Sequence, residues 1–140
     1  MTDIQITAVP FRFGARLEVE AAPATCAYFR SLIPYRQKLI HGRWSGEGFW
    51  IPLGYEALAF PVENATSYPA PGQMIFYPGG FSEAEILLAY GGVCFASKLG
   101  QLAGNHFLTI TDGLDQLPQL GRLTLWQGAQ DILFEIGPTT

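Results

Sequence analysis

The densest group of side chains that could take part in chemistry lies in the segment HGRWSGE, which begins at His41. Side chains alternate between two faces of an extended chain, so His41, Arg43 and Ser45 would point the same way if a strand ran this far. A proton-transfer group, a fixed cation and a hydroxyl would then converge. The alternative is a strand end beside a turn, with Arg43 paired to Glu47 and Trp44 in the core.

A second candidate is the glycine turn in YPGGFSEAE, which begins at Tyr77. Two adjacent glycines let backbone amides approach a ligand, although an ordinary hairpin turn explains them equally. Glu83 and Glu85 would share a strand face, and paired carboxyl groups do acid–base work when their environments separate their pKa values. No helix with Lys–Ser or Lys–Thr follows, so the sequence does not support a phosphate-binding loop.

The two histidines and two cysteines are far apart in the sequence. His106 could act as an acid or base beside Asn105, and the alternative is a hydrogen-bonded structural histidine. Cys26 and Cys94 form no CxxC or Cys/His cluster, and we expect both to be buried thiols. His41 and His106 do not have metal-ligand spacing. We therefore expect no metal and no cofactor.

The hydrophobic pattern predicts many short strands and two helices that would position these side chains. Alternating or continuous short apolar runs predict strands at residues 3–8, 11–19, 37–44, 49–53, 74–77, 85–91, 93–96, 106–111 and 132–136. One helix is expected over about residues 23–33, and another follows Leu114, with Asp112 as its N-cap and Gly128 as its C-cap. Residues 54–72 predict a long ordered loop.

This order of elements shows no βαβ alternation and predicts a mainly β fold. Closing an antiparallel sheet into a barrel removes its exposed edges, and two helices would plug the ends. No repeat or shift in composition marks a boundary, so residues 1–140 are expected to form one domain.

The composition limits the classes of partner. Only 14% of the 140 residues are charged, against about 25% in a typical soluble domain, and 49% are hydrophobic, which excludes disorder. The net charge of −4 provides no basic surface for nucleic acid. No apolar stretch of about 18 residues predicts a membrane span, and the start lacks a signal-peptide pattern, so we expect a cytoplasmic protein. The apolar excess predicts a homo-oligomer.

Five segments carry a family resemblance. They read, in chain order, APATCAYF, IHGRWSGE, ENATSYPAPGQMIFYPGGFSEAEILLAYG, FASKLGQLAGNHF and LWQGAQDI. Over about Pro23 to Asp131 the chain resembles the bacterial cyclophilin-like family catalogued as domain of unknown function 3830. The resemblance implies a cyclophilin-like barrel of about eight strands with two helices, and no reaction. In genomic setting the family resembles accessory proteins of amide and nitrogen-heterocycle breakdown, which implies a small polar ligand.

Three functional hypotheses follow. The first is a barrel that binds a small polar molecule or short peptide, with candidate ligand-binding residues Arg43, Trp44, Glu47, Tyr77, His106, His41 and Glu83. The second is peptidyl-prolyl cis–trans isomerisation. True isomerases carry a Phe-His-Arg strand motif and a Gln-Gly-Gly-Asp turn, whereas the nearest segments here are HGRW and PGGF. The third is a non-catalytic oligomeric interaction module.

Overall fold

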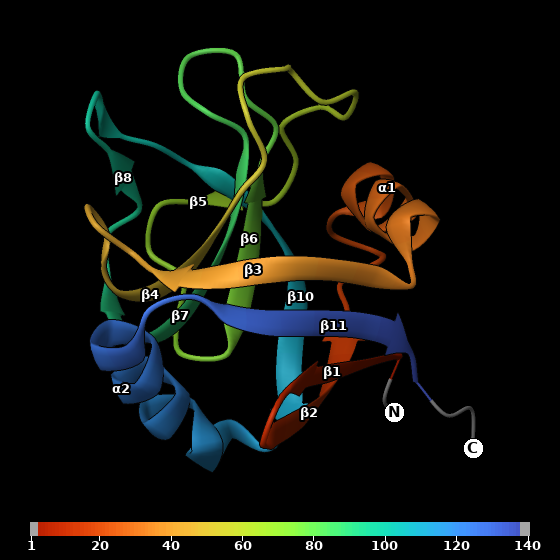
Figure 1. Ribbon diagram of the computed structural model, residues 1–140. Coiled ribbons are helices and arrows are strands. Elements are labelled where there is room, and N and C mark those ends of the chain that lie inside the picture. Colours follow the sequence, from red (N-terminus) through yellow and green to blue (C-terminus); the bar gives the residue numbers. More distant parts are fainter. Residues whose placement is uncertain (1–2, 138–140) are drawn as a thin grey trace.

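The fold is a closed antiparallel barrel with two helices, as predicted (Figure 1). The computed structural model describes residues 3–137. The eight barrel strands are β1 (Ile4–Ala8), β2 (Phe11–Leu17), β3 (Tyr35–His41), β4 (Gly46–Pro52), β6 (Gln73–Tyr77), β7 (Glu85–Val93), β10 (Gly104–Asp112) and β11 (Gln130–Ile136). Their order is β2-β1-β11-β3-β4-β7-β6-β10, and β10 also pairs with β2 and closes the barrel.

Three short strands lie outside this ring. β5 (Ala65–Thr66) pairs with β10 inside the predicted long loop. β8 (Ala96–Ser97) and β9 (Gly100–Gln101) form a separate hairpin. The strand predicted at 93–96 is therefore wrong, because β7 continues to Val93 and the chain then turns before β8.

The helices α1 (Pro23–Leu32) and α2 (Leu117–Gln127) lie at opposite sides of the barrel in Figure 1. Phe29 of α1 is fully buried, and its ring centroid lies 5.0 Å from that of Phe107 in β10. Leu117 and Leu120 of α2 are buried in the same core cluster. Both helices therefore contribute apolar side chains to the barrel interior.

Of the two caps predicted for the second helix, one is correct and one is wrong. A short 3₁₀ turn, η1 (Leu114–Gln116), precedes α2, and no side chain caps either element, so the predicted Asp112 cap is wrong. The N-cap residue of this turn is Gly113, whose backbone lies in the left-handed region and which has no side chain that could cap the turn. Gly128 is the C-cap, as predicted, at a φ of 90° that favours glycine.

Strand β7 is buried on both faces, which explains its nearly continuous apolar sequence. Ile86 and Leu88 point into the main core. Leu87 points the opposite way, into a second cluster that includes Phe95 and Leu102. The chain over residues 93–102 therefore covers the outer surface of the barrel beside β7.

The two cysteines differ in exposure. Cys26 is buried, and its Sγ donates a hydrogen bond to the Phe107 carbonyl at 3.4 Å. Cys94 is exposed, so the expectation of a second buried thiol is wrong. It lies in the covering segment just after β7, where the chain leaves the sheet.

Candidate functional site

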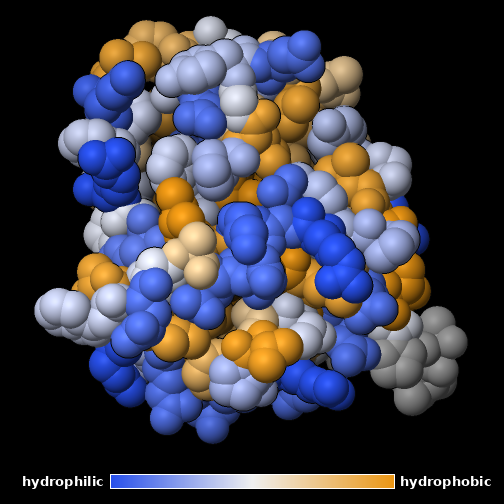
Figure 2. Space-filling view, in the orientation of Figure 1, coloured by the Kyte–Doolittle hydropathy of each residue, from blue (hydrophilic) through white to orange (hydrophobic). Residues whose placement is uncertain are grey.

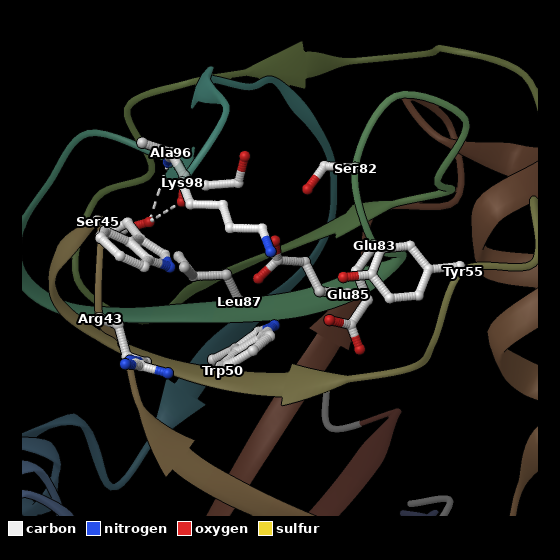
Figure 3. Close-up of a pocket in the computed structure, with 13 residues that line it drawn as sticks. Arg43, Ser45, Trp50, Tyr55, Ser82, Glu83, Glu85, Leu87, Ala96 and Lys98 are labelled. Atoms are coloured by element: carbon white, nitrogen blue, oxygen red, sulfur yellow. Dashed lines mark hydrogen bonds between the residues drawn. The ribbon is translucent and has the colours of Figure 1, made fainter.

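A cavity of about 220 Å³ opens on the outer face of the β4–β7 pair, beside the second apolar cluster (Figure 3). Four charged side chains line it: Arg43, Glu83, Glu85 and Lys98. Its aromatic side chains are Trp44, Trp50 and Tyr55, and Ser45, Ser82 and Ser97 add hydroxyl groups. The cavity therefore combines both signs of charge with aromatic walls.

The residues of β4 and β7 that line the cavity are Trp50, Glu85 and Leu87, and they face outward because side chains alternate along a strand. Phe49 and Ile51 of β4 are buried in the barrel core, which turns Trp50 outward. In the same way, Ile86 enters the core and Glu85 lines the cavity. The alternation of core-facing and outward-facing residues in β4 and β7 therefore determines which side chains form the floor of the cavity.

Glu85 is a buried carboxyl group, with 6% of the residue exposed. Among residues 3–137, the Trp50 indole N–H is the side-chain group that approaches it as a hydrogen-bond donor. Burial raises its pKa from 4.5 to about 8, the neighbouring Glu83 raises it further, and the approaching Trp50 indole N–H lowers it in part. At neutral pH this group keeps its proton.

The indole nitrogen of Trp50 is also buried. It has no hydrogen-bond partner of acceptable geometry in the described part of the chain, although it approaches Glu85 closely enough to affect the pKa of that carboxyl. A buried N–H without a partner is uncommon in native proteins. The cavity floor thus holds a buried indole N–H that lacks a well-placed acceptor, next to a buried carboxyl group.

Ser45 connects two walls of the cavity. Its Oγ accepts a hydrogen bond from the Ala96 amide at 3.0 Å and donates one to the Ala96 carbonyl at 3.1 Å (Figure 3). Its carbonyl accepts a hydrogen bond from the Cys94 amide. The turn that carries Arg43 is thereby fixed to the segment that carries Lys98.

Glu83 and Tyr77 hold the opposite wall. The Glu83 carboxylate accepts a hydrogen bond from the Gly54 amide at 3.1 Å, which fixes the chain next to Tyr55. The Tyr77 hydroxyl accepts the amides of Phe81 and Ser82 at 3.2 and 3.1 Å. Tyr77 therefore holds the glycine turn in place and does not line the cavity.

Arg43 and Trp44 are exposed neighbours at the cavity rim. The Arg43 guanidinium carbon lies 5.6 Å from the centroid of the Trp44 ring, within cation–π range. Neither alternative contact predicted for this segment occurs: Trp44 is 53% exposed, and Glu47 accepts a hydrogen bond from the Gly92 amide at 3.0 Å. Arg43 makes no ion pair with a described residue.

The predicted alignment of His41, Arg43 and Ser45 does not occur. β3 ends at His41, so strand alternation does not continue through the turn. Arg43 and Ser45 line the cavity, whereas Nε2 of His41 lies 2.7 Å from the Tyr90 hydroxyl outside it. The prediction was wrong because it extended the alternation of side chains beyond the end of β3.

His106 lies on β10, away from the cavity. Its Nε2 is 2.8 Å from Oγ1 of Thr109, and burial lowers its pKa. The hydrogen bond and the burial both agree with the structural interpretation of this histidine. Among residues 3–137, no group of three or more His, Cys, Asp or Glu side chains is placed to hold a metal ion.

Three of the seven predicted site residues therefore line the cavity, namely Arg43, Trp44 and Glu83. The cavity also contains Trp50, Tyr55 and Lys98, which were not among the predicted residues. One available signal was Glu85, which begins the otherwise apolar run EILLAYG. A charged residue in such a run indicates a site that tolerates a buried carboxyl group.

Comparison with solved structures shows the same type of fold at low sequence identity. The structure of McbB in complex with tryptophan has a TM-score of 0.72 and 16% identity over 98% of this chain. This chain spans 45% of that McbB chain. The solution structure of the hypothetical protein AF2241 from Archaeoglobus fulgidus has a TM-score of 0.59 and 14% identity, over 97% of this chain and 95% of that one.

Three further findings concern membrane-spanning helices, curated protein sequences and the family of the chain. No helix among residues 3–137 has the length and apolar character that a membrane span requires. No curated protein sequence matches the chain. The family described as "Protein of unknown function (DUF3830)" matches residues 4–136, and the chain belongs to this family.

Proposed function

We propose that this protein binds a small polar molecule in the cavity on the outer face of β4 and β7. The observation that carries the proposal is the cavity floor, where the buried Glu85 carboxyl group lies beside the Trp50 indole N–H, a buried donor that lacks an acceptor in good geometry. Leaving a buried polar group unsatisfied costs about 1–3 kcal/mol. A ligand that accepts a hydrogen bond from Trp50 recovers this free energy, and Glu85 is placed to accept a donor group of the same ligand.

The walls of the cavity support the same function. Arg43, Trp44 and Glu83 are the predicted ligand-binding residues that meet there, and Trp50 and Tyr55 add aromatic surface. Ligand sites are typically apolar or aromatic hollows with a few converging polar groups. The volume of about 220 Å³ is below the roughly 300–1,000 Å³ of drug-sized sites, which favours a small molecule over a peptide.

The comparisons are compatible with this proposal. McbB, which shares the fold, was solved in complex with tryptophan, a small polar molecule. The cyclophilin-like resemblance and its genomic setting add amides and nitrogen heterocycles to the compounds worth testing. They also motivate the finer proposal of an accessory role in the breakdown of such compounds.

A thermal-shift screen tests the proposed function. The compounds are amino acids, amines, carboxylic acids, amides, hydantoins and ureides, each applied to the wild type and to Arg43→Ala. The matched control is Arg12→Ala, because Arg12 is exposed and lies outside the cavity. A compound that stabilises the wild type and the control, but not Arg43→Ala, supports the site. A screen in which no compound separates these proteins refutes it.

Exposed apolar side chains support self-association as a separate proposal. Val62, Tyr55, Phe81 and Tyr68 are 78%, 73%, 66% and 65% exposed. The loop before β5 and the loop between β6 and β7 lie together at one end of the barrel in Figure 1, where Figure 2 shows apolar side chains among polar ones at the surface. Apolar patches on a surface often mark subunit contacts. A monomer in light scattering at micromolar concentration would contradict this proposal.

A further inference from the structure

We infer that the ligand is a small zwitterion, which places its ammonium group against Glu85 and its carboxylate against Arg43. This inference rests on the proposed function of the cavity and specifies the class of ligand. It follows from three features of the site: acidic and basic side chains that form no ion pairs, aromatic walls, and a buried carboxyl group at the floor.

Acidic and basic side chains both line the cavity, and they form no ion pair with one another. Two acidic and two basic side chains line it, and the ion pairs formed by residues 3–137 are Arg16–Glu18 and Lys38–Asp131, both elsewhere. A ligand with one charge would complement one sign and face repulsion from the other. A zwitterion complements both, and this kind of match gives binding its specificity.

Glu83 and Arg43 lie toward opposite ends of the cavity. In Figure 3 the Glu83 carboxyl group lies toward the same end as Tyr55, Arg43 lies toward the other end, and the Glu85 carboxyl group lies between them. Lys98 reaches across the cavity from the covering segment and supplies the second positive charge. A ligand with separated charges therefore has one orientation that places each charge near its opposite.

The aromatic side chains favour a cation at the acidic end. Trp50 and Tyr55 belong to the walls of the cavity, and the faces of such rings attract ammonium groups, most strongly when water is excluded. At the other end, the Arg43 guanidinium carbon lies 5.6 Å from the centroid of the Trp44 ring. The planar guanidinium is suited to a bidentate contact with a carboxylate.

Binding of an ammonium group is expected to release a proton. Glu85 faces Glu83 from its own segment, Tyr77 across the β6–β7 pair, and the cavity residues Tyr55, Arg43 and Lys98. None of these groups forms an ion pair with it. With a pKa of about 8, roughly nine-tenths of the free protein holds this proton at pH 7. When the ligand binds, its ammonium group pairs with the Glu85 carboxylate, and the proton that Glu85 held is released to the solvent.

Isothermal titration calorimetry on the full chain tests the inference. The probes are α-amino acids and ω-amino acids of increasing chain length, each with its decarboxylated amine and its N-acetyl derivative. We expect one chain length to bind best, and at least tenfold more tightly than either singly charged analogue. Two buffers of different ionisation enthalpy measure proton release. We expect about one proton at pH 7 and roughly tenfold tighter binding at pH 9.

Variants separate the ligand class from the proposed function. Glu85→Gln should abolish proton release and weaken zwitterion binding at least tenfold, whereas Glu56→Gln, an exposed glutamate outside the cavity, should change neither. If the N-acetyl derivative, an amide or a ureide binds as tightly as the zwitterion, the inference fails and the proposed function stands. If no probe and no compound of the thermal-shift screen binds the wild type, both fail.

Discussion

Glu85 should make the stability of the free protein fall as the pH rises, opposite to the behaviour of a carboxyl group held in an ion pair. Its folded-state pKa is raised to about 8, mainly by burial and then by Glu83, whereas the unfolded chain ionises near 4.5. Between these values the folded state keeps a proton that the unfolded state has lost. Stability is therefore greatest below about pH 4.5, falls up to about pH 8, and then levels.

The size of the effect follows from the pKa difference. One proton changes the free energy of unfolding by about 1.4 kcal/mol for each pH unit, so the interval from 4.5 to about 8 sets an upper limit of about 5 kcal/mol. Water that enters the cavity to solvate the carboxylate reduces this value. Glu85→Gln has the same shape and does not ionise. We therefore expect it to match the wild type near pH 5 and to be more stable by a few kcal/mol at pH 8.5.

Urea unfolding at steps between pH 5 and 9 measures this difference, with Glu56→Gln as the exposed control. The lowered pKa of His106 reduces stability as the pH falls below about 6.5, and the Cys26 thiol, with a pKa of about 11, titrates above the range. Both effects are common to all variants, so the difference between the curves isolates Glu85. A difference that stays constant from pH 6 to 8.5 would refute the reasoning, because it would mean that Glu85 is ionised and compensated, for example by Lys98.

Three further changes test the packing of the fold. Phe29→Ala should lower the free energy of unfolding by about 3–5 kcal/mol, measured in urea, because the side chain is fully buried and leaves a cavity. Gly121→Ala should lower it by about 1–3 kcal/mol despite the better helix propensity, because the added Cβ would lie 2.6 Å from the Tyr90 ring. In the native protein, a thiol reagent should label the exposed Cys94 rapidly and label Cys26 only after unfolding, as mass spectrometry would show, because Cys26 is buried and has a raised pKa.

The barrel could be predicted because its signals are local. Phe13, Ala15 and Leu17 alternate with polar or small residues, and this period matches the inward side of β2. The helix α1 begins at Pro23 and ends before Pro34, as the two prolines indicate. A chain of short strands without βαβ units has few ways to bury its apolar faces, and closure is the one that leaves no edge.

The cavity could be predicted only in part because it is assembled from four separated segments. Arg43 comes from the β3–β4 turn, Trp50 from β4, Glu85 from the start of β7, and Lys98 from the covering segment. Sequence patterns place each residue on a face of its own element but do not pair that face with a distant loop. The Ser45–Ala96 contact that joins two of these segments spans 51 residues.

The structure links ligand binding to the stability of the barrel through a single strand. β7 places Ile86 and Leu88 in the main core and presents Glu85 and Leu87 to the outer face, so the same short run supports both the fold and the site. The buried carboxyl group destabilises the free protein at any pH at which it is forced to ionise. A ligand that binds only the folded state increases the free energy of unfolding by mass action. This increase is largest at the pH values at which ionisation of Glu85 destabilises the free protein most. Ligand-induced stabilisation should therefore be greater at pH 8 than at pH 6, which distinguishes binding at Glu85 from binding elsewhere on the surface.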